Sequence, residues 1–234
     1  MVPSLLFVSD PEHASHRSEL ISACSHLHPD AVISGSNIRK SETLEKIARE
    51  NIDYLICIHY PYIIPPEILQ LPKEGVINLH PAYLPFNRGW NTPTWAIVEN
   101  TPFGATLHFM EEAIDIGDII LQKELKIDIA DTADTLYKKV LALEIDVFKE
   151  AWPLLINKKF PRKSQKALNG SVHKKGDLES IQRIDLNEKI EPERFINLLK
   201  GLTTNNVREA AFFEHGGERY RIQITIQKDS KEKP

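Results

Sequence analysis

Short apolar runs alternate with amphipathic stretches along the first 80 residues. Four apolar runs have the length and composition of strands: residues 4–9, 31–37, 52–60 and 75–80. Three stretches between them carry apolar residues at helical spacing: 16–27, the stretch that begins at Ser41, and 65–71. This alternation predicts an α/β fold with a mostly parallel sheet and helices on both of its faces.

The second half of the chain predicts two more strands and one long helix, and its character changes near residue 160. The strands are expected at 103–110 and 118–127, after a short helix at 94–100. The long helix, 131–158, has Asp131 or Thr132 as its N-cap. Five apolar residues follow one of its faces: Leu136, Val140, Leu143, Val147 and Ala151. After a turn-rich basic segment, a helix at 192–202 and a hairpin at 210–227 complete the prediction. We therefore expect a larger N-terminal domain, 1–160, and a small C-terminal α+β domain, 161–234.

The composition narrows the class of protein. The chain has 234 residues, of which 41% are hydrophobic and 26% charged, with a net charge of −4. An acidic balance argues against a dedicated nucleic-acid binder, which usually has a basic face. Cys24 and Cys57 have apolar neighbours and no metal-ligand spacing, as reduced core thiols do. The chain starts without a charged leader and holds no apolar run of roughly 20 residues, so we expect a cytoplasmic protein that does not enter the membrane.

Polar residues of the types that act in catalysis occur at the end of the predicted strand 75–80 and in the segment that follows it. Asn78 and His80 lie at its carboxyl end, where ligands bind in open parallel sheets. His108 lies within an apolar strand, and Asp115 follows it just before Gly117. An amide, an imidazole and a carboxylate are the groups needed to bind an oxyanion and move a proton. Two other interpretations stay open on the residues alone. These side chains could merely cap strands and turns, or His80, His108 and Asp115 could hold a metal ion.

The order of these residues resembles the folate-dependent formyltransferases. The motifs that carry the resemblance are Asn78-Leu79-His80-Pro81, Leu84-Pro85, Arg88-Gly89, Gly104–Phe109 and Asp115-Ile116-Gly117. The family includes glycinamide ribonucleotide transformylase, methionyl-tRNA formyltransferase and the sugar formyltransferases, and the resemblance is dense from about 52 to 125. It implies a Rossmann-like formyltransferase fold for 1–160, with Asn78, His80 and Asp115 as the catalytic residues.

The mechanism implied by the resemblance needs no metal. An acceptor amine attacks the formyl group of 10-formyl-tetrahydrofolate, and Asn78 and a protonated His80 stabilise the oxyanion. Asp115 holds the imidazole's charge and, through water, takes the amine proton. The pterin of the cofactor is held mainly by the backbone of two loops, 60–64 and 110–115. The cofactor-binding residues implied are Tyr60, Tyr62, Ile64, Met110, Glu112 and Asp115. His108 either supports the region of Asp115 or is a satisfied core histidine.

The loop 85–91 indicates the acceptor. It is similar to the loop of sugar-nucleotide N-formyltransferases, which act on dTDP-linked 4-amino-4,6-dideoxyglucose or 3-amino-3,6-dideoxy sugars ahead of surface-polysaccharide assembly, such as that of O-antigen. The substrate-binding residues implied are Asn87, Arg88, Gly89, Trp90 and Asn91, with Arg88 on the pyrophosphate. The first strand ends in Ser9-Asp10 and lacks the Gly-rich phosphate turn of the purine-pathway enzyme.

Two other functions remain open beside the hypothesis of a sugar-nucleotide N-formyltransferase. One is a methionyl-tRNA formyltransferase-like enzyme, and the basic cluster between 158 and 175 is the feature that could favour it. The other is a non-catalytic folate- or nucleotide-binding protein. In sugar formyltransferases the C-terminal part often contributes to a two-fold interface, so we expect a homodimer. The expected partners are folate and a dTDP-linked amino sugar, without nucleic acid.

Overall fold

A six-stranded mixed sheet forms the centre of the computed structural model, which describes residues 3–24, 27, 31–34, 38, 41–166 and 168–229. Its strands run in the order β2-β1-β3-β4-β6-β7. Their bounds are β1 Leu5–Ser9, β2 Ala31–Ser34, β3 Tyr54–Ile58, β4 Gly75–His80, β6 Gly104–Phe109 and β7 Ile119–Glu124. The strands β2, β1, β3 and β4 are parallel to one another, whereas β6 is antiparallel to β4 and β7 is antiparallel to β6. The predicted α/β fold with a mostly parallel sheet is therefore confirmed; residues 35–37 of the second predicted strand lie outside the described residues.

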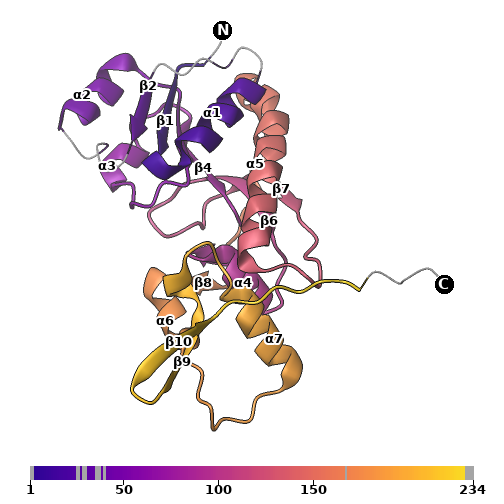
Figure 1. Ribbon diagram of the computed structural model, residues 1–234. Coiled ribbons are helices and arrows are strands. Elements are labelled where there is room, and N and C mark those ends of the chain that lie inside the picture. The colour runs from indigo at the N-terminus through magenta and orange to yellow at the C-terminus, as the bar shows by residue number, and fades with distance from the viewer. Residues whose placement is uncertain are drawn as a thin grey trace.

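Helices cover both faces of this sheet (Figure 1). The helices α1 (Ala14–Ala23) and α5 (Ala133–Ile156) share a core with Leu5 and Phe7 of β1. On the opposite face, α2 (Ser41–Glu50) and α3 (Pro66–Leu69) pack against Leu6 and Val8. Side chains alternate between the two faces of a strand, so the continuous apolar run of β1 serves both cores.

The long helix α5 is specified locally as well as by packing. Thr132 is its N-cap, and the side chains of Thr132 and Thr135 each accept a hydrogen bond from the other's backbone N–H. Asp131 instead pairs with Lys139, at 2.7 Å from Oδ1 to Nζ. Four of the five residues predicted for the apolar face, Leu136, Val140, Val147 and Ala151, are buried in the core against the sheet. The fifth, Leu143, is partly buried against the same core.

The C-terminal part forms a smaller unit below the sheet in Figure 1. Its elements are α6 (Glu179–Gln182), α7 (Pro192–Gly201), β9 (Ala211–His215) and β10 (Glu218–Ile222). The strands β9 and β10 make the predicted antiparallel hairpin, and α7 packs against α4 (Thr92–Val98). The hydroxyl of Thr94 donates to the carbonyl of Gly201 over 2.7 Å, so this unit is joined to the helix that follows the 85–91 loop.

One feature of the topology was not predicted. A two-residue strand β5 (Arg88–Gly89) pairs in parallel with β8 (Val172–His173), and Lys163 bridges to Ile119 of β7. Pairings this short leave no periodic pattern in a sequence. Their consequence is that Lys163 returns to the sheet, while Gln165 and residues 170–173 lie against the loop 85–91. The boundary near residue 160 stays a prediction.

Candidate active site

The sheet brings together the catalytic residues expected from the sequence. Asn78 and His80 lie on β4, and Asn78 is in register with His108 on the antiparallel strand β6. Asp115, in the connection from β6 to β7, returns to the same edge. Its carboxylate lies 3.4 Å from His80 Nε2 and 3.6 Å from His108 Nε2. Asn78 Nδ2 approaches the same carboxylate at 3.5 Å.

Asp115 is held as a carboxylate in an unusual backbone conformation. Burial raises the pKa of its carboxyl group, but His80, His108 and the hydrogen bonds that it accepts outweigh burial and leave the pKa below its ordinary value. The backbone N–H of Gly89 donates the shortest of these hydrogen bonds, at 2.9 Å. The φ of Asp115 is +52°, in the left-handed region that few non-glycine residues adopt. Such strained positions often occur at functional sites.

His108 is neutral at pH 7 and supports Asn78. Burial lowers the pKa of its imidazole to about 4, although Asp115 opposes this. Its Nδ1 lies 2.7 Å from the carbonyl oxygen of Phe109, which can only accept, so Nδ1 carries the proton. Nε2 is then free to accept from Asn78 Nδ2 over 3.4 Å. His108 is therefore a buried core histidine that also orients the amide of Asn78.

His80 presents a ring nitrogen without a hydrogen-bond partner. Its Nε2 is buried, and among the described residues no acceptor meets hydrogen-bond geometry with it. A buried polar group left unpaired costs about 1–3 kcal/mol. The two contacts of Asn78 Nδ2 are also long for hydrogen bonds. His80 Nε2 and Asn78 Nδ2 can therefore form hydrogen bonds with a bound ligand while losing little of their present hydrogen bonding.

A cavity of about 820 Å³ opens at this edge and joins the expected ligand sites. Its lining includes the backbone stretches 60–64 and 110–115 and all the residues expected at the cofactor: Tyr60, Tyr62, Ile64, Met110, Glu112 and Asp115. Asn78, His80, Gly89, Trp90 and Asn91 also line it. A cavity of this size, lined by both apolar and polar residues, suits a small-molecule ligand that carries polar groups.

Asn87 and Arg88 lie elsewhere, which differs from the expectation that they contact the substrate. Asn87 is fully buried, and its Nδ2 donates to the hydroxyl of Thr101 over 2.8 Å. Arg88 Nη2 donates to Gln165 Oε1 over 3.0 Å, and Arg88 is not part of the cavity lining. The pairing of β5 with β8 is the physical reason, because it holds these side chains against Gln165 and Ser171. The lysine in the lining is Lys175, whose Nζ lies 4.9 Å from the centre of the Trp90 ring.

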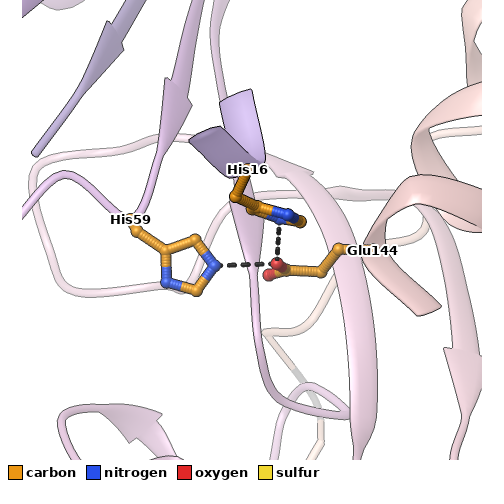
Figure 2. Close-up of side chains that lie close together, drawn as sticks. All are labelled: His16, His59 and Glu144. Atoms are coloured by element: carbon orange, nitrogen blue, oxygen red, sulfur yellow. Dashed lines mark hydrogen bonds and ion pairs between the residues drawn. The ribbon is translucent and has the colours of Figure 1, made fainter. Parts of the chain in front are cut away.

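The sequence analysis missed a buried cluster of His16, His59 and Glu144 (Figure 2), of which His59 lines the cavity. His16 Nε2 and His59 Nε2 lie 2.8 Å and 2.7 Å from the same oxygen, Oε2 of Glu144 on α5. Tyr137 extends the network, because its hydroxyl lies 3.2 Å from His59 Nδ1 and 2.7 Å from His13 Nε2. Both nitrogens are at hydrogen-bond distance from one oxygen, so the three side chains form a hydrogen-bonded network. The same donor set, two imidazoles and a carboxylate, could also hold a metal ion.

The cluster comes from elements that are distant in the sequence. His59 follows β3 with a φ of +46°, while His13 and His16 lie at the start of α1. The sequence signal for this cluster is that histidines follow both β1 and β3, because the carboxyl ends of neighbouring parallel strands lie at the same edge of a sheet. Burial, and next the neighbouring His59, lower the pKa of His13 to about 4, so this cavity-lining imidazole is neutral at pH 7.

Comparison with known families agrees with this geometry. Residues 4–152 match the family model described as formyl transferase, and residues 177–228 match the N-formyltransferase dimerization C-terminal domain. This chain belongs to the formyl transferase family. The resemblance inferred from the motifs around Asn78, His80 and Asp115 is therefore confirmed at the level of the family.

Individual relatives of this formyltransferase include enzymes that act on sugars. It is 27% identical over 194 residues to the dTDP-4-amino-4,6-dideoxyglucose formyltransferase of Mycobacterium bovis, covering 81% of each chain. It is 34% identical over 128 residues to the methionyl-tRNA formyltransferase of Clostridioides difficile, covering 54% of this chain and 41% of that one.

Two solved structures show the same fold. A sugar N-formyltransferase from Shewanella superposes with a TM-score of 0.84 at 22% identity, over 97% of this chain and 99% of that one. The formyltransferase PseJ from Anoxybacillus kamchatkensis, solved with UDP-4,6-dideoxy-4-formamido-L-AltNAc and tetrahydrofolate, has a TM-score of 0.62 at 32% identity. It covers 76% of this chain and 88% of its own. In the part of the chain that the structure describes, no helix of this formyltransferase is long and apolar enough to cross a membrane.

Proposed function

We propose that this formyltransferase moves the formyl group of 10-formyl-tetrahydrofolate to the amine of a nucleotide-linked amino-deoxy sugar. The first candidate acceptor is dTDP-4-amino-4,6-dideoxyglucose, which is named in the Mycobacterium bovis relative. The observation that carries the proposal is the convergence of Asn78, His80 and Asp115 on one cavity, with Asp115 Oδ2 3.4 Å from His80 Nε2. PseJ, with tetrahydrofolate and a UDP-linked sugar bound, supports the pairing of ligands.

In the proposed mechanism, the neutral acceptor amine attacks the formyl carbon and a new C–N bond forms. The carbonyl oxygen becomes an oxyanion, which receives hydrogen bonds from His80 Nε2 and Asn78 Nδ2. Asp115 takes the proton that the amine loses, directly or through water. The bond from the carbon to N10 then breaks, and N10 leaves as tetrahydrofolate with the proton that Asp115 gives up, directly or through water. Removing one oxyanion donor of this kind costs about 100- to 1000-fold in turnover.

The lining of the cavity offers separate groups of residues to the two proposed ligands. The stretches 60–64 and 110–115 would hold the flat pterin of the folate mainly through backbone N–H and C=O groups, as the family resemblance implies. Trp90 and Asn91 would face the sugar, and Lys175 is the lysine available to a phosphate. These assignments replace the expected contacts of Asn87 and Arg88, whose side chains are held outside the cavity.

A sugar nucleotide is favoured over tRNA by the C-terminal unit. This unit matches the N-formyltransferase dimerization domain and supplies Thr204, Asn205 and Glu209 to the cavity lining. The Clostridioides difficile tRNA enzyme instead matches only 54% of this chain. We also propose that the unit, beginning near residue 160, mediates a homodimer. Exposed apolar side chains that could take part are Leu186, Ile196, Val207 and Tyr220.

The test is a direct assay of formyl transfer. The protein is incubated with 10-formyl-tetrahydrofolate and dTDP-4-amino-4,6-dideoxyglucose, and mass spectrometry follows formyl addition to the sugar nucleotide. Product formation that is lost in His80→Gln and Asp115→Asn supports the proposal. Formylation of methionyl-tRNA, with no product from any amino-sugar nucleotide, would establish the tRNA enzyme instead. Folate binding without turnover on either acceptor would indicate a non-catalytic binding protein.

A further inference from the structure

The segment between the two family matches reaches into the active site. The matches cover 4–152 and 177–228, so residues 153–176 lie between them. Within this segment Gln165 is 2% exposed, and it lies beside the backbone of the loop that carries Asp115. A buried amide must be hydrogen-bonded to be tolerated, so its partners indicate what it does.

Gln165 uses both of its N–H groups on this loop. Its Nε2 donates to the carbonyl of Asp115 over 3.0 Å and to the carbonyl of Gly117 over 2.7 Å. Its Oε1 accepts from Arg88 Nη2 over 3.0 Å. Neither a carboxylate nor an ammonium at this place could donate twice and accept once. The geometry therefore requires an amide.

The backbone that Gln165 holds needs external support. Asp115 has a φ of +52°, and conformations of this kind persist only where the surroundings determine them. Gly117 lies so close to Phe109 that an added Cβ would stand 1.9 Å from the Phe109 carbonyl oxygen. Two hydrogen bonds to the carbonyls on either side of Ile116 hold this turn in place.

The same segment also positions Gly89, whose backbone N–H donates to the Asp115 carboxylate. Arg88 N donates to Ser171 O over 3.0 Å, and Trp90 N donates to His173 O over 2.9 Å. Gly89 lies between them, and its N–H points instead to Asp115 Oδ2 at 2.9 Å. Gln165 therefore holds Asp115 by its backbone, and Ser171 and His173 hold the strand that presents Gly89 to its carboxylate.

We infer that Gln165 is a positioning residue for formyl transfer, which aims the Asp115 carboxylate at His80 and at the acceptor amine. This inference rests on the proposed function for its kinetic consequences but not for its structural ones. Arg88 acts with it by holding the amide oxygen, which gives a role to an arginine that does not reach the cavity.

The test compares Gln165→Met, which keeps the length of the side chain and removes its hydrogen bonds, with Gln182→Met. Gln182 is a matched control, because its buried amide also donates to two carbonyls, those of Arg208 and Ala210, in the C-terminal unit. We expect kcat to fall about tenfold or more in Gln165→Met, with KM for the folate nearly unchanged, because misplaced catalytic groups lose turnover. Gln182→Met removes the same kind of contact at a place remote from Asp115, so it should leave the pKa of the Asp115 carboxyl unchanged.

A measurement without turnover keeps this test separate from the proposed function. The Asp115 carboxyl is titrated by NMR in carbon-labelled protein, assigned through Asp115→Asn. In Gln165→Met we expect its pKa to rise by about one pH unit as the Gly89 hydrogen bond weakens. If Gln165→Met does not fold, Gln165→Asn, which withdraws the amide from both carbonyls, takes its place. An unchanged Asp115 titration in the folded variant would overturn the inference, even if formyl transfer itself were confirmed.

Discussion

The neutral state of His108 makes a quantitative prediction about pH and stability. His108 is fully buried, and desolvation lowers the pKa of its imidazole from 6.5 to about 4. The unfolded chain binds a proton at this histidine below pH 6.5, whereas the folded protein does so only near pH 4. Protonation therefore favours the unfolded state, and the stabilisation is fully present above pH 6.5 and declines as the pH falls toward 4.

The magnitude follows from the two pKa values. They differ by about 2.5 pH units, and each unit corresponds to about 1.4 kcal/mol, so His108 contributes about 3 kcal/mol to the change in unfolding free energy between pH 7.5 and pH 4. Other groups titrate over this range too, including His13, whose pKa is also lowered to about 4. Groups remote from His108, such as His13, titrate equally in a His108 variant, so their contribution cancels in the comparison. Asp115 is coupled to His108, so its own titration adds a residual difference.

The assay is urea unfolding at several pH values for the wild type and for His108→Asn. The asparagine amide can still donate to the Phe109 carbonyl but cannot be protonated. We expect the variant to lose about 3 kcal/mol less than the wild type between pH 7.5 and pH 4. His215→Asn, at an exposed position of β9, is the control and should keep the wild-type pH dependence. The reasoning is refuted if His108→Asn and the wild type lose the same free energy over this range.

Three further changes have distinct expected outcomes. Gly89→Ala should reduce turnover by about 100-fold or more, because Gly89 has a φ of +92° and its Cβ would stand 2.3 Å from the His173 carbonyl oxygen; steady-state kinetics measure this. Glu144→Gln should cost about 1–3 kcal/mol of unfolding free energy at pH 7 by weakening the histidine network. Burial raises the pKa of the Glu144 carboxyl, but His59 and His16 lower it by more, so the pKa lies below its ordinary value of 4.5. The loss of unfolding free energy in Glu144→Gln should therefore shrink as the pH falls below about 4.5, which urea titrations measure. Thr132→Ala removes the α5 cap and should cost about 1 kcal/mol in thermal unfolding, with kcat unchanged.

The motifs of the active site were visible in the sequence because their spacing is local. Asn78 and His80 are two residues apart on a strand, so they share a face and point into the same edge of the sheet. Asp115 was indicated by its place before Gly117 and by the family resemblance. The structure adds that the antiparallel register of β4 with β6 brings His108 to Asn78, which no spacing along the chain reveals.

The orientation of the Arg88 side chain could not be predicted from the motif that contains it. Its place in a loop similar to that of sugar-nucleotide enzymes favoured a contact with the pyrophosphate. In the structure Arg88 faces Gln165 instead, because the neighbouring backbone pairs with residues 171–173. A side chain at the end of a loop takes its direction from its tertiary partners, so the motif could name the residue without predicting its role.

The sequence by itself predicted the order of strands and helices in the larger unit and narrowed the cap of α5 to Asp131 or Thr132, because each depends on periodicity or on neighbours a few residues away. The proposed catalytic trio of Asn78, His80 and Asp115 came from the resemblance of these motifs to a known family. The tertiary structure alone decided the β5–β8 pairing, the support of Asp115 by Gln165 and the cluster of His16, His59 and Glu144. These depend on contacts between segments separated by 50 or more residues, whose partners are selected by the packing of the whole chain.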